Sequence, residues 1–317
     1  MTEFKRSQAK YVKKSYKIKN WSEYSKGLTN RGSLTIWVSN DAISKWSVKP
    51  KGKPGGQLKY SNIAIETALM VRMVFHLPWR QTQGFLESLT KLLGKEINIA
   101  HYSTFSRRSK KLGNVSFLKP SGNRAIDILI DSTGLKMHYG NARKPPKNRG
   151  WRKFHIAVDE QSGDIIAANL GSNKAKDASR VPCLLKQIRR PIKSMKADSA
   201  YDESSVYKTI ENHSKDRSPR VLIPPKKNAK VNSKSLHMKE RNRNIRSQKK
   251  LGKRAWHQKS GYSKRSLVEV AFYRYKTIIG PMIRARTLQG QRVEALIGCK
   301  ILNIMTAQAM PKSYCTE

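Results

Sequence analysis

The stretch "AIDILIDST" at residues 125–133 decides the fold class, because it marks where the chain changes from helical to strand character. A short apolar run of this kind is typical of a buried strand, and we expect the strand to end at Asp131. The stretch "KFHIAVDEQSGDIIAANL" at residues 153–170 then predicts two strands joined by a turn at residues 162–164. The pair is a predicted β-hairpin.

Further along, helical and strand patterns alternate. A helix is predicted over residues 179–188, and "KSMKADSAYD" at residues 193–202 predicts a short strand that leads into Asp198. A helix over residues 203–211 and a strand in "RVLIPP", residues 220–225, follow. Strands that are mixed with helices in this way favour an α/β layer fold.

The N-terminal part has a helical pattern. Ser61 is a suitable N-cap for a helix that ends before Pro78, and a second helix is predicted over residues 79–93 with Gly94 as its cap. A third short helix can start at Ser103 or Thr104. Residues 61–112 resemble a helix-turn-helix with a long turn. The third helix carries four cations that either read base edges or contact phosphates only: Arg107, Arg108, Lys110 and Lys111.

Charge points to the partner. Lys and Arg total 65 against 21 acids, which gives a formal net charge of +44 spread along the chain. Such an excess implies a polyanion, and nucleic acid is the strongest candidate. No apolar run reaches the length of a membrane span and the N-terminus lacks an apolar signal core, so we expect a cytoplasmic protein without a membrane partner. The three widely spaced cysteines argue against structural zinc and disulfides.

The most basic segment lies between Lys226 and Arg265, where 15 Lys or Arg residues accompany one acid, Glu240. One interpretation is a solvated, partly disordered insertion, and the other is an arm that closes over a DNA backbone. Both remain open at the level of sequence.

Acids are scarce, so their placement is informative. Asp131 and Asp198 each end a predicted strand, and Glu269 lies in the basic stretch "GYSKRSLVEVAFYRYK" at residues 261–276. Three carboxylates are typical ligands of hard divalent ions such as Mg²⁺ or Mn²⁺. A pair of such ions can support in-line displacement at phosphorus.

Helical geometry groups the residues around Glu269. At about 100° per residue, Tyr262, Arg265, Glu269 and Lys276 fall within about 60° on one face. The face offers one metal ligand beside two cations and a hydroxyl, which suits a DNA phosphate. The opposite face is predicted to be buried through three residues: Leu267, Ala271 and Ile278.

These residues carry a specific resemblance. Their spacing reproduces the Y-x2-R-x3-E-x6-K signature of the insertion-sequence 4 and 5 families, so the chain resembles a bacterial insertion-sequence transposase of the DDE type. "DST" at Asp131 and "DSAY" at Asp198 resemble the first two acid motifs of these families. Residues 20–46, "NWSEYSKGLTNRGSLTIWVSNDAISKW", resemble the opening of the family-5 enzymes, so the similarity covers nearly the full length.

The resemblance implies an RNase H-like catalytic core over residues 121–308 with a basic insertion at about 214–260. It is preceded by a mostly helical DNA-binding region over residues 1–120 and followed by a tail at residues 309–317. The implied activity is metal-dependent cleavage of DNA at terminal inverted repeats and transfer of the 3′ ends to target DNA. A homo-oligomer on paired ends and a location at the prokaryotic nucleoid are also implied.

The resemblance also implies the roles of the residues in the signature. Asp131, Asp198 and Glu269 would be the catalytic residues and would hold two metal ions, while Tyr262, Arg265 and Lys276 would contact DNA phosphates.

Other readings of the sequence stay open. Asp202 competes with Asp198, but it has the position of an N-cap for the next helix. We expect His155 to be a structural histidine and Trp256 to be a packing residue. Two alternative functions remain: an RNase H-like nuclease or resolvase that acts on branched DNA, and a catalytically inactive DNA-binding copy.

Overall fold

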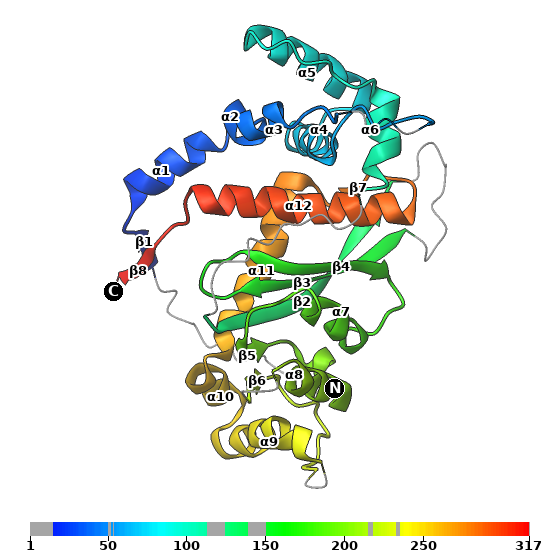
Figure 1. Ribbon diagram of the computed structural model, residues 1–317. Helices are drawn as coiled ribbons and strands as arrows, with labels where there is room; N and C mark the ends of the chain where they lie inside the picture. The colour runs from blue at the N-terminus through cyan, green and yellow to red at the C-terminus, as the bar shows by residue number, and fades with distance from the viewer. Residues whose placement is uncertain are drawn as a thin grey trace, which may run out of the picture.

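The computed structural model describes residues 15–49, 52, 54–112, 124–138, 150–214, 218–232 and 235–316. Helices lie above and below one central sheet (Figure 1). The N-terminal elements are β1 (Ser15–Ile18), α1 (Trp21–Asn30), α2 (Leu34–Trp37), α3 (Asn40–Ser44), α4 (Asn62–Val74), α5 (Trp79–Leu92) and α6 (Tyr102–Ser109). The central ones are β2 (Ile126–Met137), β3 (Trp151–Asp159), β4 (Ile165–Ser172), α7 (Val181–Leu185), β5 (Ile192–Lys196), α8 (Ser204–His213) and β6 (Arg220–Leu222). The last are α9 (Lys239–Leu251), α10 (Lys253–Ser260), α11 (Ser266–Arg274), β7 (Met282–Ile283), α12 (Leu288–Gln308) and β8 (Ser313–Thr316).

The main sheet has the strand order β4-β3-β2-β5-β6, and β7 pairs with the far end of β2. Strand β3 runs antiparallel to its neighbours β2 and β4, whereas β5 runs parallel to β2 and β6 runs parallel to β5. Helices α7 and α8 connect the parallel strands, as a crossover requires. This mixed sheet with helices on both faces confirms the α/β class expected from the sequence and is consistent with an RNase H-like core.

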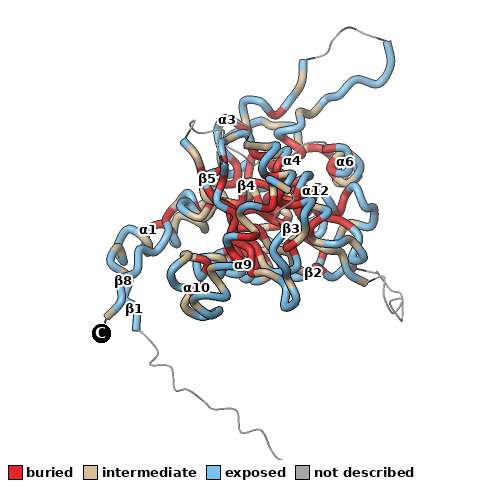
Figure 2. The backbone as a smooth tube through the Cα atoms, turned by 90° about the horizontal axis from the view of Figure 1, so that it is seen from below, coloured by how far each residue is buried: buried red, intermediate tan, exposed pale blue. Residues whose placement is uncertain are grey.

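Each face of the sheet has its own apolar core. Leu129 and Leu135 of β2 pack with α4, α11 and α12, while Ile128 and Ile130 pack with α7 and α8 on the other side. Alternate residues of a strand point to opposite faces, so Asp131 shares the side of α11 and Ser132 the side of α7. The buried residues lie at the centre of the molecule along β2, β3, β4 and α12 (Figure 2).

Strand β2 differs from its prediction. It does not end at Asp131 but continues to Met137, because β3 pairs with it over the whole stretch from Ile128 to Lys136. The polar residues after Asp131 gave no strand signal, and the ladder to β3 supplies the hydrogen bonds that extend the strand. Asp131 therefore lies in the middle of a strand and not at its end.

The N-terminal helices follow the sequence closely. Ser61 caps α4 by accepting a hydrogen bond from the Ala64 N–H, and Gly94 follows α5 with a positive φ of 62°. Helix α4 is shorter than predicted and ends at Val74. Helix α6 starts at Tyr102 with His101 as its N-cap, slightly earlier than predicted. The hairpin turn also forms where it was predicted, with φ 73° at Gly163.

Much of the basic segment is folded. Helices α9 and α10 hold residues 239–251 and 253–260, and they bury Ile245 and Trp256. Arg241 of α9 forms an ion pair with Asp202, which ties this helix to the turn after β5. The described part of the segment is therefore largely helical from Lys239 onward, and an arm that closes over a DNA backbone stays a prediction.

The helix that carries the signature is not a regular α-helix. A 3-10 turn over Tyr262–Arg265 precedes α11, and a π turn, η5 (Tyr275–Ile279), follows it. Between these turns α11 itself is a regular helix, and its buried side is a neighbouring side to the one predicted, with i, i+4, i+7 spacing. Ala271 is buried as predicted, but Leu267 is 43% exposed, and the core contacts come instead from Val268, Phe272 and Tyr275.

The π turn packs against α12 through a close contact. Tyr275 is buried, and a Cβ placed on Gly298 of α12 would lie 2.6 Å from its ring. No side chain larger than hydrogen fits there without displacement of the ring. Gly298 therefore allows α12 to lie close to the segment that carries Glu269 and Lys276.

We predict that Gly298→Ala lowers the free energy of unfolding by about 1–3 kcal/mol, because the methyl group overpacks the contact with Tyr275. The matched control is Gly84→Ala in α5, where a Cβ meets nothing within 4 Å. This change should raise stability by up to ~1 kcal/mol. Urea unfolding of both variants tests the prediction, and equal behaviour of the two would contradict it.

Candidate active site

Arg265 joins two of the three predicted acids. Its Nη1 donates to Asp131 Oδ2 at 2.7 Å, and its Nη2 donates to Glu269 Oε1 one helical turn away. The guanidinium thus brings together a strand residue and a helix residue that are separated by 138 positions in the chain. The two carboxylates lie on the face of the sheet covered by α11.

Asp131 lies in a largely buried position. Burial raises the pKa of its carboxyl, the negative charge of Asp198 adds to this, and the Ser132 N–H and Arg265 oppose it. The Ser132 N–H donates to Asp131 Oδ1 at 2.8 Å. An ionised carboxylate here is costly unless a cation accompanies it.

Asp198 comes two residues after β5. Its side chain accepts a hydrogen bond from the Ala200 N–H at 2.8 Å and so caps a 3-10 turn at Ser199–Tyr201. Because β5 is parallel to β2 and adjacent to it, the end of β5 lies beside the middle of β2. The charge of Asp198 reaches both Asp131 and Tyr262.

Tyr262 and Lys276 flank this group. Burial raises the pKa of Tyr262 to about 12, with Asp198 and Asp131 adding to the shift and Arg265 opposing it, so the hydroxyl remains a hydrogen-bond donor. Lys276 Nζ donates to Thr133 Oγ1 at 2.6 Å, on the same face of β2 as Asp131. All six residues of the predicted site lie in one region, and Thr133 is a member that the sequence did not indicate.

Asp131, Asp198 and Glu269 have the carboxylate chemistry that a divalent cation prefers, but their side chains are not gathered into a metal site in this structure. In the described part of the chain, no group of three or more His, Cys, Asp or Glu is close enough together to hold a metal ion. Asp131 and Glu269 share one cationic partner, Arg265, and Asp131 also senses the charge of Asp198. Carboxylate oxygens that converge on positive charge are the donors that Mg²⁺ and Mn²⁺ prefer.

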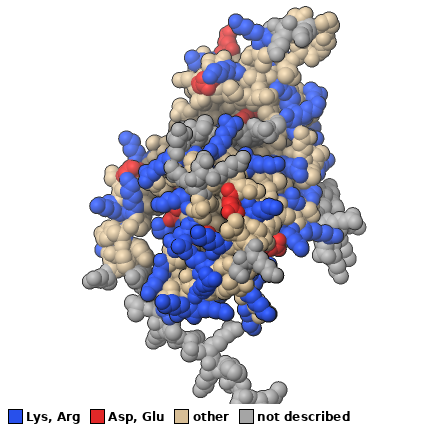
Figure 3. Space-filling view, turned by 60° about the horizontal axis from the view of Figure 1, so that its bottom comes forward, with Lys and Arg blue, Asp and Glu red and all other residues tan. Residues whose placement is uncertain are grey.

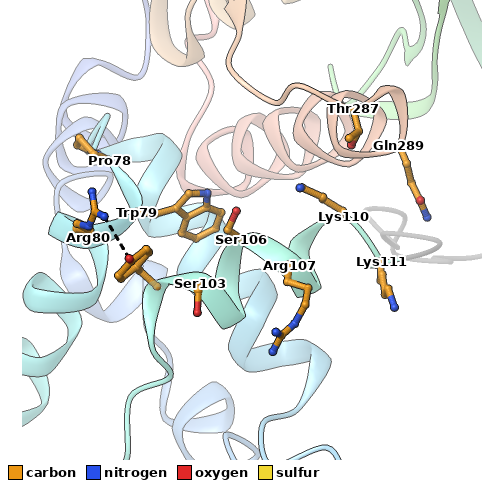
Figure 4. Close-up of a pocket in the computed structure, with 11 residues that line it drawn as sticks. Pro78, Trp79, Arg80, Ser103, Ser106, Arg107, Lys110, Lys111, Thr287 and Gln289 are labelled. Carbon is orange, nitrogen blue, oxygen red and sulfur yellow. Dashed lines mark hydrogen bonds between the residues drawn. The ribbon is translucent and has the colours of Figure 1, made fainter. Parts of the chain in front are cut away.

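The predicted DNA-binding cations divide into two kinds. Arg108 is half-buried and is held by other residues of the protein, since it donates to the Tyr60 carbonyl and to Asn62 Oδ1. Arg107, Lys110 and Lys111 instead line a cavity of about 640 Å³ that also includes Arg80. The cavity lies between α5, α6 and the start of α12 (Figure 4), and none of the three predicted catalytic acids lines it. Arg80, which the sequence analysis missed, lies in the first turn of α5.

The other residues that the sequence analysis weighed for the site, Asp202, Trp256 and His155, have structural contacts. Asp202 is fully buried and forms a two-point ion pair with Arg241, at 2.7 and 3.2 Å, so it is not the N-cap that the sequence suggested. Glu203 occupies the cap position of α8. Trp256 is buried against Tyr262, which confirms it as a packing residue. His155 is wholly buried and bonded to Asp177.

Comparison with protein families decides the family. Two family models described as transposase DDE domain match the chain, one over residues 29–140 and the other over residues 123–304, which is more than half of its length. The chain belongs to the DDE transposase family. The resemblance to a DDE transposase is thereby confirmed, and the protein is a DDE-type transposase, an enzyme family that normally uses divalent metal ions.

Among solved structures, this transposase is similar to the piggyBac transposase in a cryo-EM structure of its synaptic complex with hairpin DNA. The identity is 11%, the TM-score is 0.37, and the match covers 89% of this chain and 75% of the other. In the described part of this transposase, no helix is long and apolar enough to cross a membrane.

Loss of charge at Asp198 and at Asp202 should change the free energy of unfolding by different amounts. We predict that Asp202→Asn lowers the free energy of unfolding by about 3–5 kcal/mol, because it leaves Arg241 buried without its partner. Asp198→Asn should change stability by less than ~1 kcal/mol, because asparagine also caps well. Urea unfolding of both variants measures the difference. A larger loss for Asp198→Asn would contradict this assignment.

Proposed function

We propose that this transposase binds the terminal inverted repeats of its insertion sequence, cleaves the DNA and transfers the 3′ ends to target DNA by metal-dependent phosphoryl transfer. The observation that carries the proposal is the pairing of Arg265 with both Asp131 and Glu269. This contact docks the signature helix on the central strand and so gathers acids from distant parts of the sequence. The family assignment supports the same reaction class.

In this proposal Asp131, Asp198 and Glu269 hold two Mg²⁺ or Mn²⁺ ions. When bound, the ions supply Lewis acidity to the attacking and leaving oxygens. The acids contribute oxygen ligands, and the burial of Asp131 favours a nearby positive charge. No side chain has to form a covalent intermediate.

Three side chains then orient the phosphate. Arg265 uses one N–H group for each carboxylate, which leaves other guanidinium donors for a non-bridging phosphate oxygen. Tyr262 stays protonated and donates, since its pKa is raised. Lys276, held at Thr133, adds a second cation on the same face of the sheet. Together they oppose the charge that develops at phosphorus.

The first experiment is a cleavage and strand-transfer assay with Mg²⁺ on DNA that carries the inverted repeats flanking the coding sequence. We predict that Glu269→Gln binds this DNA like the wild type but cleaves it at least ~100-fold more slowly, because a metal ligand is lost. The matched control, Glu211→Gln, neutralises an exposed acid on α8 and should cleave normally.

The same assay separates the alternative functions. Preference for branched DNA of any sequence would favour a nuclease or resolvase. Binding by the wild type without cleavage would favour an inactive DNA-binding copy. Equal cleavage by Glu269→Gln would reject Glu269 as a ligand.

We further propose that the cavity between α6 and α12 is part of the surface that binds the inverted repeat, in a homo-oligomer that pairs two ends. Four cations surround it, and a Cβ at Gly290 of α12 would lie 3.5 Å from Lys110 Cγ. A phosphate in the cavity would therefore contact the N-terminal helices and the catalytic part together. Basic side chains also cover much of the face in Figure 3, with acids only as isolated spots, which suits a long DNA path and a protein associated with the nucleoid.

We predict that Arg107→Gln with Lys110→Gln weakens binding to repeat DNA and lowers the slope of log affinity against log salt by about two, one for each lost phosphate contact. Lys208→Gln on α8, an exposed cation far from the cavity, is the control for charge loss alone. Arg108→Gln should leave the slope unchanged, since this guanidinium already donates to Tyr60 and Asn62 of the protein. Titration at several salt concentrations measures all three, and an unchanged slope for the double variant would reject the cavity as a phosphate site.

A further inference from the structure

A fourth carboxylate lies behind the acid-bearing strand. Asp177 Oδ1 accepts hydrogen bonds from Ser132 Oγ at 2.8 Å and from His155 Nε2 at 2.9 Å. Its other oxygen, Oδ2, forms an ion pair with Lys153 Nζ at 2.8 Å. The Asp177 side chain is 15% exposed and that of His155 is fully buried. Asp177 is therefore a nearly buried acid that is fixed in place by three donors.

The cluster reaches Asp131 through one residue. Ser132 is bonded through its side chain to Asp177 and through its backbone N–H to Asp131 Oδ1. His155 lies directly opposite Ser132 in the register of β3 against β2. Asp177, from the loop after β4, therefore holds the two strands together at the point where Asp131 projects from the other face.

Charge balance keeps this fourth acid compatible with the site. Burial alone would raise the pKa of Asp177, but the donors His155, Lys153 and Ser132 hold it well below its usual range, so it is ionised. Lys153 neutralises the resulting charge. Burial raises the pKa of the Tyr201 hydroxyl, and the negative charges of Asp177, Asp131 and Asp198 raise it further. Tyr201 therefore remains a neutral phenol between the two segments that carry acids.

The arrangement does not suit nucleophilic catalysis. Ser132 Oγ donates to Asp177 and not to His155, and His155 is buried away from any substrate. A serine nucleophile needs its base within hydrogen-bond reach and an exposed reacting oxygen. The cluster can support the neighbouring acids, but it cannot attack a phosphate.

We propose that Asp177 is a positioning residue of this transposase: through Ser132 it fixes the orientation of Asp131 for metal binding, without touching metal or DNA. This inference rests on the proposed function, because it assigns Asp131 to the metal. Partners that orient ligands in this way typically contribute 10–100-fold to metal affinity or activity. Asp177 would thus act on the reaction from the opposite face of the sheet.

The test compares Asp177→Asn with Asp159→Asn in the full-length protein. Asp159 is also buried and paired with a cation, Arg190, but it lies at the end of β3 and has no bond to Ser132. We expect Asp177→Asn to bind repeat DNA within about 2-fold of the wild type, to cleave ~10–100-fold more slowly and to need more Mg²⁺ for half-maximal rate. Asp159→Asn should keep the metal dependence of the wild type.

Two further measurements separate positioning from general stability. Mn²⁺ binding followed by electron paramagnetic resonance should weaken in Asp177→Asn, whether or not the DNA substrate is cleaved. Ser132→Ala, a smaller change, should reproduce the defect, and the double variant should be no worse than either single variant because both act through one hydrogen bond. If Asp177→Asn fails to fold, Ser132→Ala carries the test alone.

The outcomes are distinguishable. Unchanged metal dependence in Asp177→Asn, or an equal loss in Asp159→Asn, would overturn the positioning role. Absence of cleavage by the wild type, together with Mn²⁺ binding that weakens in Asp177→Asn, would reject the proposed transposition reaction and keep the role of Asp177 at the metal site.

Discussion

The ion pair between Arg265 and Asp131 is the contact on which the candidate site depends. Asp131 lies in the centre of the sheet, where burial opposes its charge, and Arg265 supplies the nearest compensation. The same guanidinium holds Glu269, so the acids meet only if the signature helix docks correctly on β2. A protein with a net charge of +44 thus gathers its scarce acids where its own cations can balance them.

Packing of the signature segment makes that docking possible. One side of this segment places Val268, Phe272 and Tyr275 in the core, while Arg265 and Lys276 bond to residues of β2. Tyr275 fits against α12 only because residue 298 is glycine. On the other face, Asp177 joins the strands that flank the site. The central acid, Asp131, is therefore supported from both sides of one sheet.

Much of the architecture could be predicted from sequence because it rests on local signals. Apolar runs, the cap at Ser61 and the glycine turns at Gly94 and Gly163 act within a few residues, and each formed where it was expected. Predictions failed where distant partners decided the outcome. Strand β2 extends past Asp131 because β3 pairs with it, and Asp202 is an ion-pair partner because Arg241 reaches it. Leu267 is exposed because α11 packs on the core through Val268, Ala271 and Phe272.

The sequence by itself determined the α/β class, the polyanionic partner and the identity of the residues in the signature, because periodicity, net charge and exact spacing are properties of the chain. Only the tertiary structure decided which residues meet. Arg108 donates to the Tyr60 carbonyl, while Arg107 and Lys110 line a cavity. Asp177 accepts a hydrogen bond from Ser132, the neighbour of Asp131, on the opposite face of β2. These contacts join segments far apart in the chain, and their energies depend on burial and geometry that exist only after folding.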